Sequence, residues 1–284
     1  MIPRYTNPEM GRIWSEQRRY ETWLQVEVAA AEAMAAAGIV PAEAARDLRE
    51  KGAFNVARID EIEKTTQHDV IAFTTSVAEI VGPSARWLHF GLTSSDVVDT
   101  AQAIQMVEAC DLILTNMPAL ASAIQARADE HKHTPMIGRT HGVHAEPMTF
   151  GLKLALWYAE WQRDIERVRR AREAVRVGKI SGAVGTFAHL DPSIEASVCD
   201  RLGLAAAPIS SQVIKRARRA GGRTTRAWRM PGNRMSCKNP PPRNLRPRSL
   251  RGKDKPMTRR SKAPLGRTTP CANWCKSTWL ANSA

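Results

Sequence analysis

The sequence lacks any run of about twenty consecutive apolar residues, which argues against an ordinary transmembrane helix. It also lacks, at its N-terminus, the apolar stretch of a secretory signal. Hydrophobic residues make up 43% of the 284 residues, a share typical of a soluble globular protein. We therefore expect a cytoplasmic protein with no membrane partner.

Cysteines are few and follow no framework. The five are Cys110, Cys199, Cys237, Cys271 and Cys275. Their odd number and scattered spacing predict no set of disulfides. A zinc site near the C-terminus would need four ligands, and no histidine follows His189. We predict no bound metal.

Acidic residues are almost absent from the last quarter of the chain. Residues 215–284 contain 20 Lys and Arg but one acid, whereas residues 1–214 contain 22 Lys and Arg and 27 Asp and Glu. The formal charge of +14 therefore belongs to a basic tail and not to the whole chain.

The basic tail has two interpretations. A disordered basic segment could bind nucleic acid nonspecifically by displacing counterions from phosphate. Alternatively, translation of a G/C-rich gene in the wrong frame would give the same mixture of Arg, Pro, Gly and Ala. We favour the frameshift, because no Val, Ile, Phe or Tyr occurs after Ile214. Binding of nucleic acid is then not expected, except nonspecifically through this tail.

Helical patterns fill most of residues 1–214, and residues 1–10 are expected to be extended or looped. Glycine and proline positions predict short helices over 14–37, 41–52, 56 onward, 69–80 and 192–202. Two long helices are predicted over 94–130 and 149–177. We predict three parts: an N-terminal helical domain (1–92), a partial long-helix bundle (93–214) and a disordered tail (215–284).

Glycines punctuate the segments between the helices. Residues 136–147, between the long helices, are expected to form a polar loop that presents His141 and His144. Residues 178–191 form a second glycine-rich loop, which lacks the G-K-[ST] ending of a phosphate loop. A third loop is expected over 208–212.

Three stretches centred on histidine could carry chemistry: TTQHD (65–69), HFGLTSSD (89–96) and GRTHGVH (138–144). Histidine exchanges protons near neutral pH, which suits general acid–base catalysis. Hydroxyl groups and the free N–H groups at a helix start suit the binding of carboxylate or phosphate. Together these stretches predict an anionic substrate that undergoes proton transfer.

Each of these residues also has a structural interpretation. His68 could be a helix cap, and His89 could be packed between apolar neighbours. The hydroxyls at 93–95 could merely cap a helix, which is their commoner role. A metal shared by His141 and His144 is possible, but we expect no acidic or cysteine partner to be placed to complete its ligand set.

A resemblance to a known family favours the functional interpretation. Five stretches in order resemble the adenylosuccinate lyase family, of the fumarase/aspartase superfamily: Arg4-Tyr5, TTQHDVIAF (65–73), HFGLTSSDVVDT (89–100), GRTHGVHAEP (138–147) and GKISGAVGT (178–186). The resemblance spans residues 1–214 and ends there.

The resemblance implies an all-α protein with a small helical N-terminal domain and a long-helix bundle, assembled as a homotetramer. It implies β-elimination of fumarate from a small-molecule substrate without metal or organic cofactor. The substrates would be adenylosuccinate, which gives AMP, and the succinyl-aminoimidazole carboxamide ribotide of purine biosynthesis.

The resemblance also implies roles for single residues. His141 would be the general acid that protonates the leaving nitrogen, and His68 would assist or orient it. Thr93 and Ser94 would hold a succinyl carboxylate. The other substrate-binding positions implied are Arg4, Tyr5, Gln67, Asp69, His89, Thr140 and Gln212.

The sequence also departs from the family. The family's general base is a serine in an S-S-x-M-P-x-K-x-N motif, and the 284 residues contain no such motif. We expect little or no lyase activity from this chain and apolar helix faces left uncovered. The alternatives are another fumarate-releasing lyase, of the argininosuccinate lyase type, and a nucleic-acid-binding protein.

Overall fold

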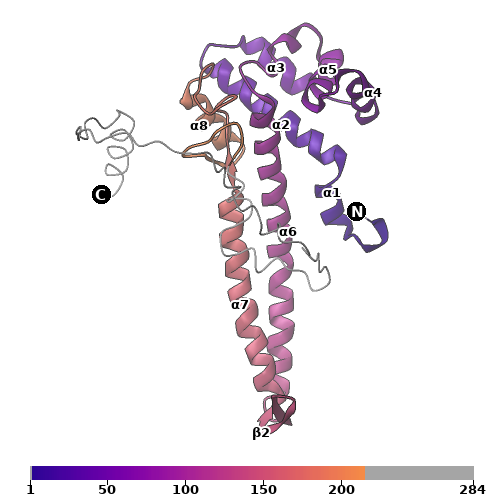
Figure 1. The fold of residues 1–284 in the computed structure, drawn as a ribbon, viewed down its shortest axis with the longest axis vertical. Coiled ribbons are helices and arrows are strands. Elements are labelled where there is room, and N and C mark those ends of the chain that lie inside the picture. Colours follow the sequence, from indigo (N-terminus) through magenta and orange to yellow (C-terminus); the bar gives the residue numbers. More distant parts are fainter. Residues whose placement is uncertain (1, 215–284) are drawn as a thin grey trace, which may run out of the picture. The chain divides into compact units, whose positions relative to one another are not determined.

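The computed structural model describes residues 2–214, which fall within one compact unit and are mostly helical (Figure 1). The elements are η1 (Pro3–Tyr5), α1 (Pro8–Ile13), α2 (Glu16–Ala36), α3 (Ala42–Lys51), α4 (Val56–Thr66), α5 (Asp69–Val81), η2 (Gly82–Trp87), α6 (Ser94–Glu130), β1 (Pro135–Thr140), β2 (Val143–Thr149), α7 (Phe150–Val175), β3 (Val177–Gly178), α8 (Pro192–Arg201) and β4 (Ala205–Ala206). The predicted all-α class is confirmed, with two small two-stranded sheets in the described part.

The predicted helices α2 to α5 and α8 are present close to their expected bounds. Gly38 ends α2 with a φ of 73°, a conformation that glycine adopts without strain. The extended or looped structure predicted for residues 1–10 is wrong from Pro8, where α1 begins, and η1 forms a short 3-10 helix before it. The Asn7 side chain accepts hydrogen bonds from Glu9 and Met10. An Asn-Pro start can therefore nucleate a helix too short to show periodicity.

The core joins the N-terminal helices to the start of α6. The rings of Tyr20 and Phe73 stack with centroids 5.7 Å apart, and Trp23 meets both edge-on. The same buried cluster contains Val97 of α6 and Val198 of α8. This shared core fixes the first turns of α6 against α2. The domain boundary at residue 92 stays a prediction.

Residues 136–147 do not form the predicted loop. They belong to a hairpin in which β1 pairs antiparallel with β2, from Pro135 opposite Thr149 to Thr140 opposite Val143. His141 and Gly142 form the two-residue turn with φ of 52° and 79°. Positive φ at both turn residues matches the right-handed twist of a hairpin, which explains the departure from a loop.

The long helices α6 and α7 lie side by side, and the hairpin joins them at the end far from α3 and α5 (Figure 1). In the described part, α6 is also the one helix long and apolar enough to cross a membrane, by length and composition alone. Its first turns carry the buried polar residues Asp96, Asp99 and Thr100. These first turns of α6 belong to the buried core of the described part.

The glycine-rich stretch after α7 is largely irregular, as predicted. It begins with β3, which pairs in parallel with β4, and continues to Asp191, whose side chain caps α8. The predicted loop at 208–212 is also irregular. The predictions for residues 215–284, disorder included, lie outside the described residues.

Candidate active site

The N-termini of α5 and α6 meet at a histidine and a serine. His68 caps α5, and its Nδ1 accepts a hydrogen bond from the backbone N–H of Ile71 at 3.3 Å. Its Nε2 lies 3.4 Å from the Oγ of Ser94, the first residue of α6. Because Nδ1 of the neutral ring accepts here, Nε2 carries the proton and faces Ser94. The helix cap considered above exists, and it also orients the ring.

The residues beside His68 are held by local backbone. The Oδ1 of Asp69 accepts from the N–H of Val70 at 2.7 Å, and the Nε2 of Gln67 donates to the carbonyl of Lys64 at 2.9 Å. Both Gln67 and Asp69 are exposed. They flank His68, and their role in substrate binding stays a prediction.

Thr93 is the N-cap residue of α6, as its position in the sequence predicts. Its backbone N–H donates to the Oδ2 of Asp96 at 2.9 Å, so the carboxylate reaches back to the helix start. The first turn of a helix presents N–H groups without intrahelical partners and the positive end of the helix dipole. Thr93 and Ser94 thus combine hydroxyl groups with a helix end that favours an anion.

Two further segments pack against this helix start. The N–H of Ser181 donates to the Oδ1 of Asp96 at 3.2 Å, and the Oγ of Ser181 lies 2.6 Å from the Oγ of Ser210. The N–H of Ile214 donates to the Oδ2 of Asp99 at 2.7 Å. Gln212 is exposed two residues before this anchor, so its segment is brought to the predicted site.

Sequence reasoning missed the polar residues that organise the helix start. Asp96 is buried and bonds to two other buried residues, Lys179 and Ser181. The Oγ of Ser181 in turn contacts the Oγ of Ser210. Two signals were available: an acid at the third position of a helix with a Thr cap, and a single lysine inside a glycine-rich stretch. Neither signal says which acid pairs with which amine.

His89 is held by a buried carboxylate. Its backbone N–H and its Nδ1 lie 2.8 and 2.6 Å from the two carboxylate oxygens of Glu27, which is 2% exposed. Burial lowers the pKa of His89, but the hydrogen bond and charge of Glu27, with the charge of Asp96, raise it overall above its usual value. The packing interpretation of His89 is therefore partly right. The ring is a quarter exposed, and its proposed contact with substrate is untested.

The described part of one chain does not bring His141 or Thr140 to His68. His141 occupies the turn of the hairpin and Thr140 precedes it, and both are exposed. Helix α6 begins beside His68 and ends close to the hairpin after 37 residues. At 1.5 Å per residue its length is about 55 Å. A single copy therefore presents the predicted site as two separate groups of residues.

Arg4 and Tyr5 lie near the described N-terminus, and both are exposed. The Arg4 guanidinium stands 4.7 Å from the centroid of the Tyr5 ring, in cation–π geometry. The pair offers a cation and an aromatic face, as a nucleotide requires.

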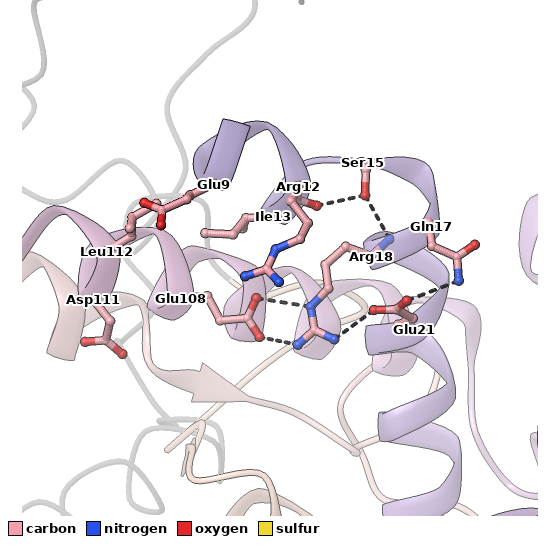
Figure 2. Close-up of a pocket in the computed structure, with 10 residues that line it drawn as sticks. All are labelled: Glu9, Arg12, Ile13, Ser15, Gln17, Arg18, Glu21, Glu108, Asp111 and Leu112. Carbon is pink, nitrogen blue, oxygen red and sulfur yellow. Dashed lines mark hydrogen bonds and ion pairs between the residues drawn. The ribbon is translucent and has the colours of Figure 1, made fainter. Parts of the chain in front are cut away.

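One cavity of the described part lies away from these residues. A space of about 660 Å³ opens between α1, α2 and α6, and none of the predicted site residues lines it (Figure 2). Arg18 spans it and bonds to Glu21 and Glu108. Arg18 is thus paired with carboxylates across the opening, and we do not assign the chemistry to this cavity.

Metal ligands do not gather in the described part. Within residues 2–214, no group of three or more His, Cys, Asp or Glu side chains is placed to hold a metal ion. The metal shared by His141 and His144, considered from the sequence, therefore has no supporting ligand set in this region.

The chain is a helical protein in which the start of α6 gathers polar residues from distant segments of the sequence. The family described as Lyase matches residues 4–221. The chain belongs to this lyase family, and the match ends near the change in composition after Ile214.

The resemblance predicted from the five stretches is confirmed. The chain is 52% identical over 220 residues to adenylosuccinate lyase from Bacillus subtilis, a match covering 78% of this chain and 51% of that protein. It is 53% identical over 216 residues to adenylosuccinate lyase from Streptococcus mutans, covering 76% and 50%. The chain thus spans about half the length of these relatives.

Solved structures agree with the fold. A fumarate lyase from Mesorhizobium sp. BNC1 superposes with a TM-score of 0.68 at 30% identity, covering 72% of this chain and 50% of that one. The 3-carboxy-cis,cis-muconate lactonizing enzyme from Pseudomonas putida superposes with a TM-score of 0.66 at 28% identity, covering 72% and 49%. The arrangement of α6, α7 and the N-terminal helices is therefore that of the fumarate lyase fold.

Proposed function

We propose that this chain carries the succinyl-binding part of an adenylosuccinate lyase. Such an enzyme eliminates fumarate from adenylosuccinate to give AMP, and from the succinyl-aminoimidazole carboxamide ribotide of purine biosynthesis. The observation that carries the proposal is the 52% identity to adenylosuccinate lyase over 220 residues. The contact between His68 and Ser94 at the start of α6 supports it, because it places a proton-carrying ring beside an anion-binding helix end.

The elimination removes a proton from one carbon while the C–N bond to its neighbour breaks. The electron pair left by the proton becomes the new double bond, and the leaving nitrogen needs a proton. In the proposed mechanism, Thr93, Ser94 and the first N–H groups of α6 hold a carboxylate, where negative charge develops. His141 donates the proton to nitrogen, a contribution of about 10²–10⁴-fold for such a group. Thr140 lies beside His141 and binds the same succinyl group.

The proposed active site forms between copies of the chain. His68 and His141 lie at opposite ends of α6, so one copy supplies the helix start and another supplies the hairpin. Exposed apolar side chains on the long helices support such an assembly, since Leu152 and Leu156 are 61% and 63% exposed and Trp157 is 49% exposed. We propose a homotetramer, with Arg4, Tyr5, Gln67, Asp69, His89 and Gln212 completing the nucleotide pocket.

We propose the cytoplasm as the location. Cys110 and Cys199 are free thiols, as expected in a reducing compartment. The 284 residues contain no S-S-x-M-P-x-K-x-N motif to provide the general base, so we expect this chain to bind substrate and to turn it over slowly or not at all. Nonspecific binding of nucleic acid would come from the basic tail.

Equilibrium binding to the purified 284-residue chain tests the proposed function. We expect saturable binding of adenylosuccinate, weaker binding of AMP, which lacks the succinyl group, and weaker binding of argininosuccinate. Preference for argininosuccinate would favour the other lyase class. Fumarate release from adenylosuccinate, measured beside a full-length relative, tests the expected loss of turnover, and comparable rates would contradict it.

A further inference from the structure

A single buried carboxylate organises the start of α6. Asp96 is fully buried and accepts hydrogen bonds from three backbone N–H groups: Thr93 at 2.9 Å, Ser181 at 3.2 Å and Gly182 at 3.2 Å. The first belongs to the proposed carboxylate site, and the other two belong to the glycine-rich loop. One side chain therefore joins two segments separated by more than eighty residues.

Lys179 is the counter-charge of Asp96. Its ammonium group pairs with the Oδ1 of Asp96, and both side chains are fully buried. The ammonium also donates to the carbonyl of Gly182 at 3.3 Å. One turn along α6, the Oγ of Thr100 bonds to both the N–H and the carbonyl of Lys179, at 3.1 and 3.0 Å. Helix α6 thus holds Lys179 at its backbone and at its amine.

The pairing has an electrostatic consequence for the proposed site. A carboxylate in the first turn of a helix is favoured by the dipole, but its charge opposes the binding of a second anion at that end. Glu195, also buried, adds another carboxyl group beside the loop and accepts from the N–H of Ile180 at 2.7 Å. Lys179 is bonded directly to the carboxylate of Asp96 and offsets its charge.

We propose that Asp96 and Lys179 are positioning residues of the carboxylate site: Asp96 fixes the Thr93–Ser94 helix start against the glycine-rich loop, and Lys179 cancels its charge so that a dianion can bind. This inference rests on the proposed function. It also places Ser181, held by Asp96 and facing Ser210, at the border of that site. Neither Asp96 nor Lys179 needs to touch the substrate.

Binding of succinate and of its monoamide, succinamate, to the full chain tests the charge component. Lys179→Met leaves the negative charge of Asp96 without a counter-charge. We expect the repulsion between this charge and succinate to weaken succinate binding on the order of tenfold. The affinity for succinamate, which carries one negative charge, should fall by a smaller factor. The double variant Asp96→Asn/Lys179→Met removes both charges, so its ratio of succinate affinity to succinamate affinity should return to that of the wild type. A purely structural role would weaken both ligands equally.

Thr100→Val provides a second variant if the charge variants do not fold. It removes the bonds to the Lys179 backbone and keeps both charges, so both ligands should weaken while their affinity ratio stays that of the wild type. Glu79→Gln, which breaks an exposed ion pair with Arg58, is the matched control and should change neither affinity. Circular dichroism reports whether each variant is folded.

The outcomes separate this inference from the proposed function. If the wild type binds neither succinate nor adenylosuccinate, the proposed function fails. If the wild type binds both, and Lys179→Met binds succinate as tightly and with the same preference over succinamate, the positioning role is wrong. A changed affinity ratio in Lys179→Met that the double variant restores supports it.

Discussion

The Nε2 of His68 lies 3.4 Å from the Oγ of Ser94, and this contact joins the starts of two helices that are twenty-five residues apart in the sequence. Each residue also serves its own helix, His68 as a cap and Ser94 as the first residue. The contact brings two local helix signals together, and we propose that they form one site with a proton donor beside an anion-binding helix end.

Ser94→Ala should weaken binding of succinate to the full chain by about tenfold or more, since a hydrogen bond to a charged group contributes about 1.5–3 kcal/mol. Calorimetry or ligand-observed NMR measures the change. Ser122→Ala, at an exposed position on the same helix, is the control and should leave the affinity unchanged. Equal affinities for Ser94→Ala and the wild type would remove Ser94 from the site.

The pair of His89 and Glu27 predicts a pH dependence of stability. The folded state raises the pKa of His89, so the stabilisation is fully present below the unfolded pKa of about 6.5 and is lost as the pH rises through the folded pKa. The midpoint of thermal unfolding should therefore fall as the pH rises above about 6.5.

His89→Asn tests the source of this dependence. Asparagine tolerates the positive φ of 59° at this position but does not titrate. The variant should lose most of the pH-dependent fall seen in the wild type. A fall of the same size in both proteins would assign it to another group.

Gly185 and Gly182 form a matched pair, because both have a φ of 79°. A Cβ at Gly185 would lie 2.2 Å from the carbonyl oxygen of Ser210, whereas a Cβ at Gly182 meets nothing within 4 Å. Gly182→Ala should cost about 1–2 kcal/mol of unfolding free energy through its backbone conformation alone. Gly185→Ala should cost clearly more, and it should displace the 208–214 segment from the site. Denaturant unfolding measures both, and equal costs would contradict the contact with Ser210.

The apolar face of α7 predicts self-association. Leu156→Lys should reduce the assembly of the chain, because Leu156 is 63% exposed and would be covered by another copy. Sedimentation velocity measures the change, with Gln162→Glu, an exposed polar position on the same helix, as the control. An unchanged distribution of species for Leu156→Lys would place the interface elsewhere.

Much of the fold could be predicted from the sequence, because helix starts and stops are local. Gly38 and the Thr93 cap fix helix ends within a residue or two. The hairpin could not be predicted so directly, since its turn residues, His141 and Gly142, resemble any glycine-containing loop. Its strands gain stability only by pairing with each other, and that pairing is not a local property of either strand.

The site was only partly predictable for a similar reason. His68, Thr93 and Ser94 stand in stretches whose chemistry is visible in the sequence, and the structure brings His68 and Ser94 together. The pairing of Asp96 with Lys179 depends on a contact across eighty-three residues. Such a contact leaves no periodic or spacing signal, so it emerges only from the fold.

We propose above all that the junction of α5 and α6 binds the succinyl group of a purine nucleotide. The most direct measurement follows the His68 ring by NMR while adenylosuccinate is added to the ¹⁵N-histidine-labelled chain, with AMP as the matched ligand. We predict a saturable shift of the His68 signals with adenylosuccinate, little shift with AMP, and loss of the response in Ser94→Ala. An unmoved His68 while adenylosuccinate binds, or the same shift with AMP, would contradict the account.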